Sequence, residues 1–326
     1  MKKLLKSGLR RAANVASLHS QRYPSTEREA LLLGQIAARQ IRQIERARTL
    51  ADVEFSVFSQ WGEDGIIEWL VTYADDLPES FIEFGVENYR ESNTRFLLQN
   101  RNWRGLVIDG SREYVETIMA DEVSWRHDLS AVCAFITSDN IEELVAAAGF
   151  SGEIGILSID IDGNDYWVWK AISNVSPHYV IVEYNANFGD LVPLTIPYRP
   201  DFVRTAADYT NLYYGASCKA MTHLADQKGY VLLGSNRTGS NLFFARADRA
   251  ERLLKRLSDT SPRPCRVREA RDRSGELSLT GGLTRSQLIA DRTVVNVATG
   301  TTGPLHSFGD LFSKEWRATL ASSITA

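Results

Sequence analysis

The stretch from residue 80 to residue 185 alternates short apolar runs with helical patterns, and this alternation constrains the fold more than any other feature. Five runs of strand length occur in it: SFIEFGV, RGLVIDGS, AVCAFIT, EIGILSID and HYVIVEYN. They are apolar on both faces, so they predict parallel strands covered by helices on each side. Two later runs, YVLLGSN and NLFFARA, read as a closing antiparallel hairpin. The expected fold class is therefore α/β, with a mostly parallel sheet.

Changes in composition divide the chain into three expected regions. Residues 1–50 form a basic N-terminal arm and a helix, residues 51–250 the α/β domain, and residues 251–326 a C-terminal extension packed on that domain. In the first region, Leu33 and Ile36 recur at helical spacing with two later isoleucines, which predicts a helix that packs on the body.

The charge of the chain is unevenly distributed. The net charge of the 326 residues is −4, and residues 1–48 hold eleven Lys/Arg and three Glu, or +8, so the remainder carries −4 − 8 = −12. This balance argues against a nucleic-acid partner for the body. The arm at residues 1–24 is either a solvated basic helix or a peripheral contact with a membrane surface.

The cysteines and the apolar runs bear on the compartment. Cys133, Cys218 and Cys265 have no metal-like spacing and read as reduced thiols of a cytoplasmic protein. No apolar run approaches the roughly 18 residues that a membrane span needs. We expect a cytoplasmic protein that could lie peripherally at the inner face of the membrane.

Acidic residues crowd the segment LSIDIDGNDYWVW, which begins at Leu157. A Ca²⁺ loop of the EF-hand type is excluded, because its sixth position would be Asp165 instead of Gly and its twelfth would be Ala171. Asn164 or Asp165 can instead cap the helix that follows. Asp160 and Asp162 are two residues apart, so in an extended chain they would point the same way.

Polar residues end four of the predicted strands. They are Glu83, Asp109, Asp160 with Asp162, and Glu183 with Asn185. Ligands of open α/β sheets bind outside the carboxyl ends of the strands, so these residues predict a pocket. The alternative for the two aspartates is a salt bridge to a buried Arg or Lys.

The turn after the first strand distinguishes between nucleotide ligands. A dinucleotide site needs three glycines there, and this turn has only Gly85. A class I methyltransferase needs an acid and a glycine at the first strand end, and an acid at the second that accepts the ribose hydroxyls of S-adenosylmethionine. Glu83, Gly85 and Asp109 supply those parts.

Longer motifs resemble a known family. FSQWGEDGIIEWL, FIEFGVENYRESNTRFLLQNRNWRGLVIDGS, LSIDIDGNDYWVWKAI and VIVEYN are similar to FkbM-like, S-adenosylmethionine-dependent methyltransferases of an uncharacterised bacterial group, over about residues 55–300. The resemblance implies a Rossmann-type methyltransferase fold and O-methylation of a glycan, a glycan precursor or a natural product, as in polysaccharide biosynthesis. The positions that match the family's cofactor strand ends are Glu83, Gly85, Asp109 and Ser111.

The leading hypothesis is thus an O-methyltransferase, and it assigns roles to residues. The expected cofactor-binding residues are Gln60, Glu63, Glu83, Gly85, Asp109, Gly110 and Ser111. The expected catalytic residues are Asp160, Asp162, Glu183 and His223, the last as a free base near neutral pH. A divalent cation such as Mg²⁺ would be held by Asp160, Asp162, Glu183 and Asn185.

Alternatives from other classes stay open. Without a metal, one of the same carboxylates would act as general base. A non-catalytic scaffold protein of a surface-polysaccharide assembly and a metal-dependent hydrolase that uses the same acids are also compatible with the pattern, because a fold does not settle a function.

Overall fold

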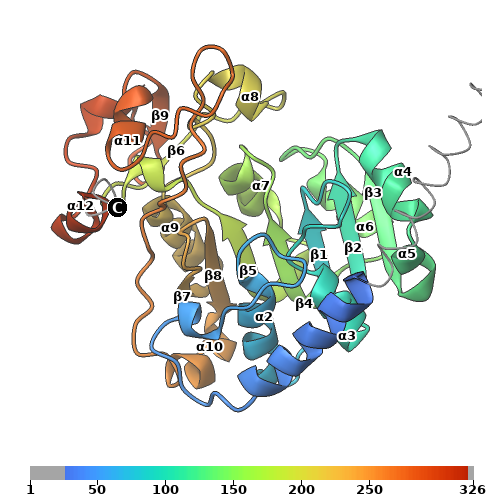
Figure 1. The fold of residues 1–326 in the computed structure, drawn as a ribbon. Coiled ribbons are helices and arrows are strands. Elements are labelled where there is room, and N and C mark those ends of the chain that lie inside the picture. Colours follow the sequence, from blue (N-terminus) through green and yellow to red (C-terminus); the bar gives the residue numbers. More distant parts are fainter. Residues whose placement is uncertain (1–25, 322–326) are drawn as a thin grey trace, which may run out of the picture.

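The computed structural model describes residues 26–321, and a seven-stranded sheet forms its centre (Figure 1). The strands lie in the order β3-β2-β1-β4-β5-β8-β7. Their bounds are β1 Ser80–Phe84, β2 Arg104–Asp109, β3 Leu129–Cys133, β4 Gly152–Ile159, β5 Val175–Glu183, β7 Tyr230–Ser235 and β8 Asn241–Arg246. The first five are parallel, and β8 runs antiparallel to both β5 and β7. This confirms the predicted Rossmann-type fold with its antiparallel hairpin.

Helices cover both faces of the sheet. One face carries α6 (Ile141–Ala147), α7 (Asp165–Ala171) and α9 (Cys218–Lys228). The other carries α2 (Glu63–Thr72), α3 (Arg95–Arg101), α4 (Arg112–Ala120), α5 (Glu122–Arg126) and α10 (Ala247–Leu254). Successive strand residues serve opposite layers, as when Phe81 packs with the second group and Ile82 with the first. Burial on both faces explains why the strands are continuous apolar runs.

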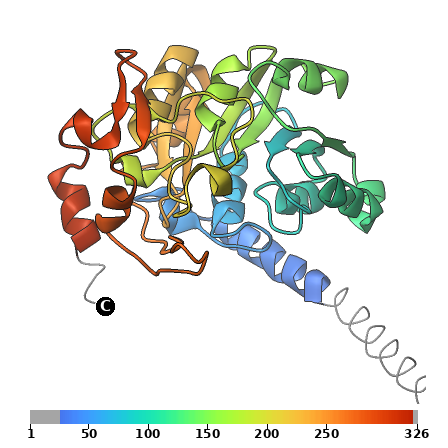
Figure 2. The ribbon, with the colours of Figure 1, turned by 90° about the horizontal axis from the view of Figure 1, so that it is seen from above.

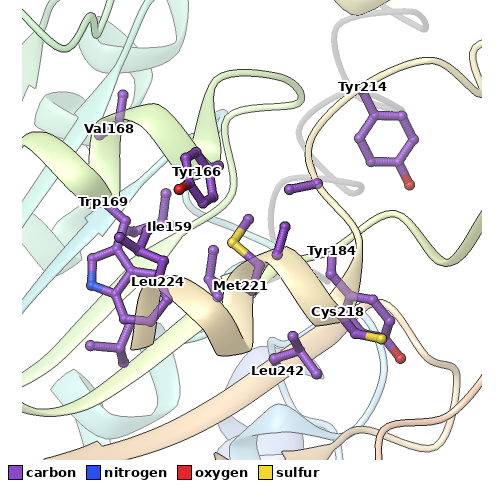
Figure 3. Packing of buried hydrophobic residues seen from close by; sticks show 14 of the residues in the cluster. Ile159, Tyr166, Val168, Trp169, Tyr184, Tyr214, Cys218, Met221, Leu224 and Leu242 are labelled. Carbon is purple, nitrogen blue, oxygen red and sulfur yellow. The ribbon is translucent and has the colours of Figure 1, made fainter. Parts of the chain in front are cut away.

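The layer formed by α7 and α9 packs densely beneath the last strands (Figure 3). Trp169 of α7 lies with its ring centroid 5.2 Å from that of Phe244 on β8, and Met221 and Leu224 of α9 fill the space beside it. The ends of α9 follow from local sequence: Ser217 caps its first turn, and Gly229 ends it in the left-handed conformation.

The order of the strands creates a crevice between β1 and β4. The chain builds outward from β1 to β3 and then returns to place β4 on the other side of β1. At such a switch point the connections leave in opposite directions, which opens a space outside the carboxyl ends of the strands.

The first described helix covers residues 26–41 and lies against α3 and the loop before α2 (Figures 1 and 2). Its packed face carries Gly34, Ala38 and Ile41, and a Cβ on Gly34 would come within 2.4 Å of Val57. The helix packs on the body as predicted, but Leu33 and Ile36, at 66% and 46% exposed, lie outside the packed face. The small residues decide which face approaches the body, because they permit closer contact.

Residues 1–24, the predicted arm, lie outside the described residues. Among residues 26–321, no helix combines the length and apolar character needed to span a bilayer.

A second, smaller sheet joins the insertion after β5 to the C-terminal region. Its order is β10-β9-β6, with β6 Leu194–Thr195, β9 Thr293–Asn296 and β10 Thr302–Pro304. The remaining elements are η1 Leu50–Val53, η2 Ala186–Phe188, α8 Arg204–Ala207, α11 Thr284–Leu288, η3 Leu305–Phe308 and α12 Lys314–Ala321. Sequence patterns did not predict this sheet, because strands of two to four residues have no recognisable periodicity.

Candidate functional site

A cavity of about 530 Å³ lies at the carboxyl ends of β1, β2, β4 and β5, beside α8 and the C-terminal segment. Its lining is strongly acidic. The acids are Glu87, Glu91, Asp109, Asp160, Asp162, Glu183 and Glu269. Among the described residues that line it, Arg204 is the only Lys or Arg. The cavity therefore favours ligands that carry positive charge.

The turn after β1 keeps the shape of a glycine-rich turn with a single glycine. Gly85, Glu87 and Tyr89 have φ angles of 72°, 48° and 61°, all in the left-handed region. For residues with a Cβ this conformation costs about 1–2 kcal/mol each. Tyr89 offsets that cost by burying its ring and by a hydrogen bond of 2.9 Å between its hydroxyl and Thr94.

Gly85 itself cannot be replaced without moving the backbone. A Cβ on this residue would lie 1.6 Å from the carbonyl oxygen of Asp160, so the turn after β1 lies directly against the end of β4. This contact brings the first turn and the acids that follow β4 to the same place.

Asp109, at the end of β2, ties the two neighbouring turns together. One carboxylate oxygen accepts a hydrogen bond of 2.8 Å from the backbone N–H of Glu87, and the other accepts one of 2.8 Å from that of Ser111. Asp109 also lines the cavity, and each oxygen can accept a further hydrogen bond from a ligand.

An apolar wall continues the cavity beyond Asp109. Phe135 is 51% exposed although it is a large aromatic, and it lines the cavity with Ala134 and Ile136. Gly110 faces it, since a Cβ on Gly110 would lie 3.6 Å from the ring of Phe135. A flat, partly apolar group could pack against this wall.

Three acids meet where β4 and β5 end. Asp160, Asp165 and Glu183 each place one carboxylate oxygen within 4.8 Å of the other two, and we call them the acid cluster. Burial, and then the charges of neighbouring acids, raise the pKa of Asp160 and of Glu183 well above the ordinary values. Burial also raises the pKa of Asp165 to about 6. A shared proton or a bound cation would therefore stabilise this cluster.

Asp162 does not belong to the acid cluster. Strand β4 ends at Ile159, and Asp162 has a φ of 55°, so the extended geometry that would align it with Asp160 is broken. Its carboxylate forms a 2.5 Å ion pair with Arg204, which also pairs with Glu269 at 3.0 Å and lies 3.7 Å over the ring of Tyr214. The salt-bridge alternative thus applies to Asp162.

Of the seven predicted cofactor residues, Gln60, Gly85, Asp109 and Gly110 line the cavity. Glu63, Glu83 and Ser111 do not, and their assignment as direct ligands needs correction. The buried Glu83 carboxylate accepts hydrogen bonds from the backbone N–H groups of Asn93 and Thr94, at 2.7 and 3.0 Å. Burial raises its pKa to about 7.

Glu63 and Ser111 also form hydrogen bonds within the protein that hold them outside the cavity. Glu63 is fully buried and accepts hydrogen bonds from the side chains of Asn236 and Asn241. Ser111 caps α4 by accepting from the N–H of Tyr114. All three residues thus shape loops beside the cavity without reaching into it.

The predictions that Asn185 binds a metal and that His223 acts as a base also need correction. Asn185 is fully buried, its amide nitrogen donates to the carbonyls of Leu212 and Tyr214, and its oxygen accepts from Asn187, so it does not face a metal. His223 lies on α9 outside the cavity, with its ring 3.0 Å from Gln227.

The sequence pattern predicts only a capping role for Asp165, yet Asp165 is a member of the acid cluster. Arg204, Phe135 and Glu269 were also missed. A signal existed for Arg204: several acids at one sheet edge require a counter-charge, and the insertion after β5 contains only Arg199 and Arg204 as basic residues. Phe135 and Glu269 lie in loops whose path no local pattern predicts.

Comparison with known proteins gives limited matches. No protein-family model matches the chain, and no curated protein matches it. Among solved structures, it is similar to the CurJ carbon methyltransferase, with 10% identity, a TM-score of 0.36, and coverage of 57% of this chain and 52% of that one. The chain therefore spans about half the length of that protein.

Two other solved structures give similar values. An S-adenosylmethionine-dependent methyltransferase from Clostridium acetobutylicum has 11% identity and a TM-score of 0.35, covering 56% of this chain and 89% of that one. An O-methyltransferase family protein from Burkholderia thailandensis has 14% identity and a TM-score of 0.34, covering 57% and 58%. At these values the function has to be inferred from the chain's own site.

Proposed function

We propose that this chain is an S-adenosylmethionine-dependent methyltransferase that methylates a hydroxyl group. The observation that carries the proposal is the turn after β1, which is left-handed at residues 85, 87 and 89 and is tied to Asp109 at the end of β2. A left-handed turn with one glycine, joined to an acid at the end of the second strand, supports binding of this donor.

The parts of the cavity correspond to the parts of the donor. The methionine portion would lie along the turn at Gly85, near Gln60, and the ribose hydroxyls would donate to Asp109. The adenine would pack against Phe135 beside Gly110. The donor carries a sulfonium and an ammonium group against one carboxylate, and an acidic cavity suits this positive charge.

The reaction would occur at the acid cluster, beside the turn that Gly85 forms. The acceptor oxygen attacks the methyl carbon and forms a C–O bond while the C–S bond breaks. The electron pair of that bond stays on sulfur, and S-adenosylhomocysteine leaves. Without a metal, the hydroxyl proton passes to whichever carboxylate of Asp160 and Glu183 is ionised, as both line the cavity.

The acceptor is proposed to be a glycan, a glycan precursor or a natural product. Support comes from the resemblance to FkbM-like enzymes, and from a cavity mouth built by α8 and Glu269, outside the sheet. The absence of disulfides among the three cysteines is compatible with a cytoplasmic location. The basic residues 1–24 would contact anionic lipids at the inner face of the membrane.

The test is calorimetry with S-adenosylmethionine and S-adenosylhomocysteine, followed by measurement of S-adenosylhomocysteine release with a panel of glycans. We expect saturable donor binding and acceptor-dependent release. If the donor does not bind at millimolar concentration, the chain is not a methyltransferase, and the alternative of a non-catalytic scaffold protein is favoured. Modification of an acceptor without donor would instead favour the hydrolase.

A further inference from the structure

The carboxylate of Glu183 is buried without a partner. It is 9% exposed, no hydrogen bond reaches either of its oxygens from residues 26–321, and Oε2 is fully enclosed. Asp160, which directly follows β4, likewise has no hydrogen bond or ion pair to its carboxylate within the described chain. Buried charges without partners are strongly unfavourable unless something else compensates them.

Other buried acids of this chain show how unusual this is. Glu68 is 1% exposed and forms ion pairs of 2.7 Å with both Arg42 and Arg101. Asp64 accepts three backbone hydrogen bonds at its Oδ2, although its buried Oδ1 has no partner. The fold therefore supplies partners to acids that have a structural role, and it leaves the pair at the cavity without them.

The geometry of the acid cluster fits one metal ion. Oxygens bound to the same Mg²⁺, Mn²⁺ or Ca²⁺, at about 2.0–2.6 Å from it, are at most about 4–5 Å apart. The three carboxylate oxygens lie within 4.8 Å of one another. Asp165 already accepts from the N–H groups of Ile161 and Gly163, each at 2.9 Å, and this fixes its orientation while leaving a lone pair for a ligand.

We propose that Asp160, Asp165 and Glu183 bind one divalent cation that prefers oxygen ligands, such as Mg²⁺, Mn²⁺ or Ca²⁺. This set replaces the one expected from sequence, because Asp162 is paired with Arg204 and Asn185 is engaged by backbone groups. Asp160 and Glu183 line the cavity, so an ion bound between them would be open to it. If the proposed function holds, the cation would lower the pKa of an acceptor hydroxyl, and the proton would leave to solvent, since Asp160 and Glu183 would then serve as ligands.

The test measures metal binding in the absence of methyl donor. Full-length protein is stripped with EDTA and titrated with Mn²⁺, and free Mn²⁺ is followed by electron paramagnetic resonance. We expect one ion per chain. Asp160→Asn and Glu183→Gln should each weaken binding about tenfold or more. Both variants should remain folded by circular dichroism, since they remove unpaired buried charge.

Asp162→Asn is the matched control, and it should weaken binding far less than Asp160→Asn or Glu183→Gln, because its carboxylate is paired with Arg204 and lies outside the acid cluster. Loss of Mn²⁺ binding in that variant, with binding kept in Glu183→Gln, would overturn the ligand set. No Mn²⁺ binding at millimolar concentration would overturn the site itself. Donor calorimetry is run separately, so failure of the metal site and failure of the methyltransferase are distinguishable.

Discussion

A Cβ added to Gly85 would come within 1.6 Å of the carbonyl oxygen of Asp160. Residue 85 therefore fixes the distance between the end of β1 and the end of β4. Since the donor is proposed to bind on one side of this contact and the acceptor on the other, the same approach aligns the two halves of the site.

Gly85→Ala should therefore destabilise the protein and abolish donor binding. The left-handed φ alone costs about 1–2 kcal/mol, and the collision adds about 1–3 kcal/mol. Gly152→Ala is the matched control: its φ is 69°, but its Cβ would meet nothing within 4 Å. Denaturant unfolding of both variants separates backbone strain from collision. Equal losses of stability would show that the contact with Asp160 is unimportant.

Asp109→Ala should weaken S-adenosylmethionine binding by about 1.5–3 kcal/mol, the range for hydrogen bonds to a charged group. It should also lower stability, because the N–H groups of Glu87 and Ser111 lose their acceptor. Ser111→Ala controls for this, since it removes the cap of α4 at a cost of about 1 kcal/mol but does not line the cavity. Calorimetry should find donor affinity lost in the first variant and kept in the second.

Glu183→Gln should stabilise the metal-free protein at pH 8 and leave it unchanged near pH 4. Burial raises the pKa of Glu183 in the folded state, while its pKa in the unfolded chain stays at about 4.3. Below the unfolded pKa both states are protonated. Above the unfolded pKa, Glu183 ionises readily only in the unfolded chain. The free energy of unfolding of the parent therefore falls by up to about 1.4 kcal/mol per pH unit until the pH passes the folded pKa. The glutamine variant escapes this loss.

Thermal unfolding in EDTA between pH 4 and pH 8 measures this difference. Glu68→Gln is the control with the opposite sign, because its carboxylate pairs with Arg42 and Arg101 and its removal should destabilise at pH 8. A stability difference for Glu183→Gln that did not vary with pH would contradict an unpaired carboxylate.

Arg204→Met should loosen α8 and weaken acceptor binding without changing donor affinity. Arg204 is 13% exposed in its side chain and joins Asp162 to Glu269, and these contacts are worth about 1–3 kcal/mol. Arg199→Met is the control, because its pair with Asp201 is exposed. Hydrogen exchange over residues 199–214 should rise in the first variant only. Unchanged exchange would mean that other contacts hold α8.

Deletion of residues 1–24 should leave donor binding intact, because the ion pair of 2.7 Å between Glu27 and Arg95 and the packing of Gly34 lie beyond it. Co-sedimentation with vesicles that contain anionic lipid should fall, and added salt should have the same effect on the full chain. Full-length protein that ignores such vesicles at low salt would rule out the membrane contact.

Local patterns in the sequence determined the sheet and the part of the cavity at the ends of β1 and β2. Most of the apolar runs from SFIEFGV to NLFFARA appear as strands, because a strand buried on both faces must be apolar throughout. The exception is AVCAFIT, of which only residues 131–133 belong to the half-buried strand β3 while 134–137 form a loop. Gly85 and Asp109 could be placed at the cavity because each directly follows or ends such a strand. The side chains of Glu83 and Glu63 could not, because hydrogen bonds hold them away from the cavity: Glu83 is held by the loop before α3, and Glu63 by Asn236, 173 residues later.

The tertiary structure decided which residues form the acid cluster. Whether Asp160 and Asp162 align depends on where β4 ends, and the left-handed φ of Asp162 sends its carboxylate to Arg204, 42 residues later. Asp165 joins Asp160 and Glu183 only because β4 and β5 are neighbours and the turn between β4 and α7 folds back. Charge pairs and clusters between distant segments obey no local period, so the sequence determined the strand ends and their acids, while the fold decided which acids are paired and which remain free to bind a ligand.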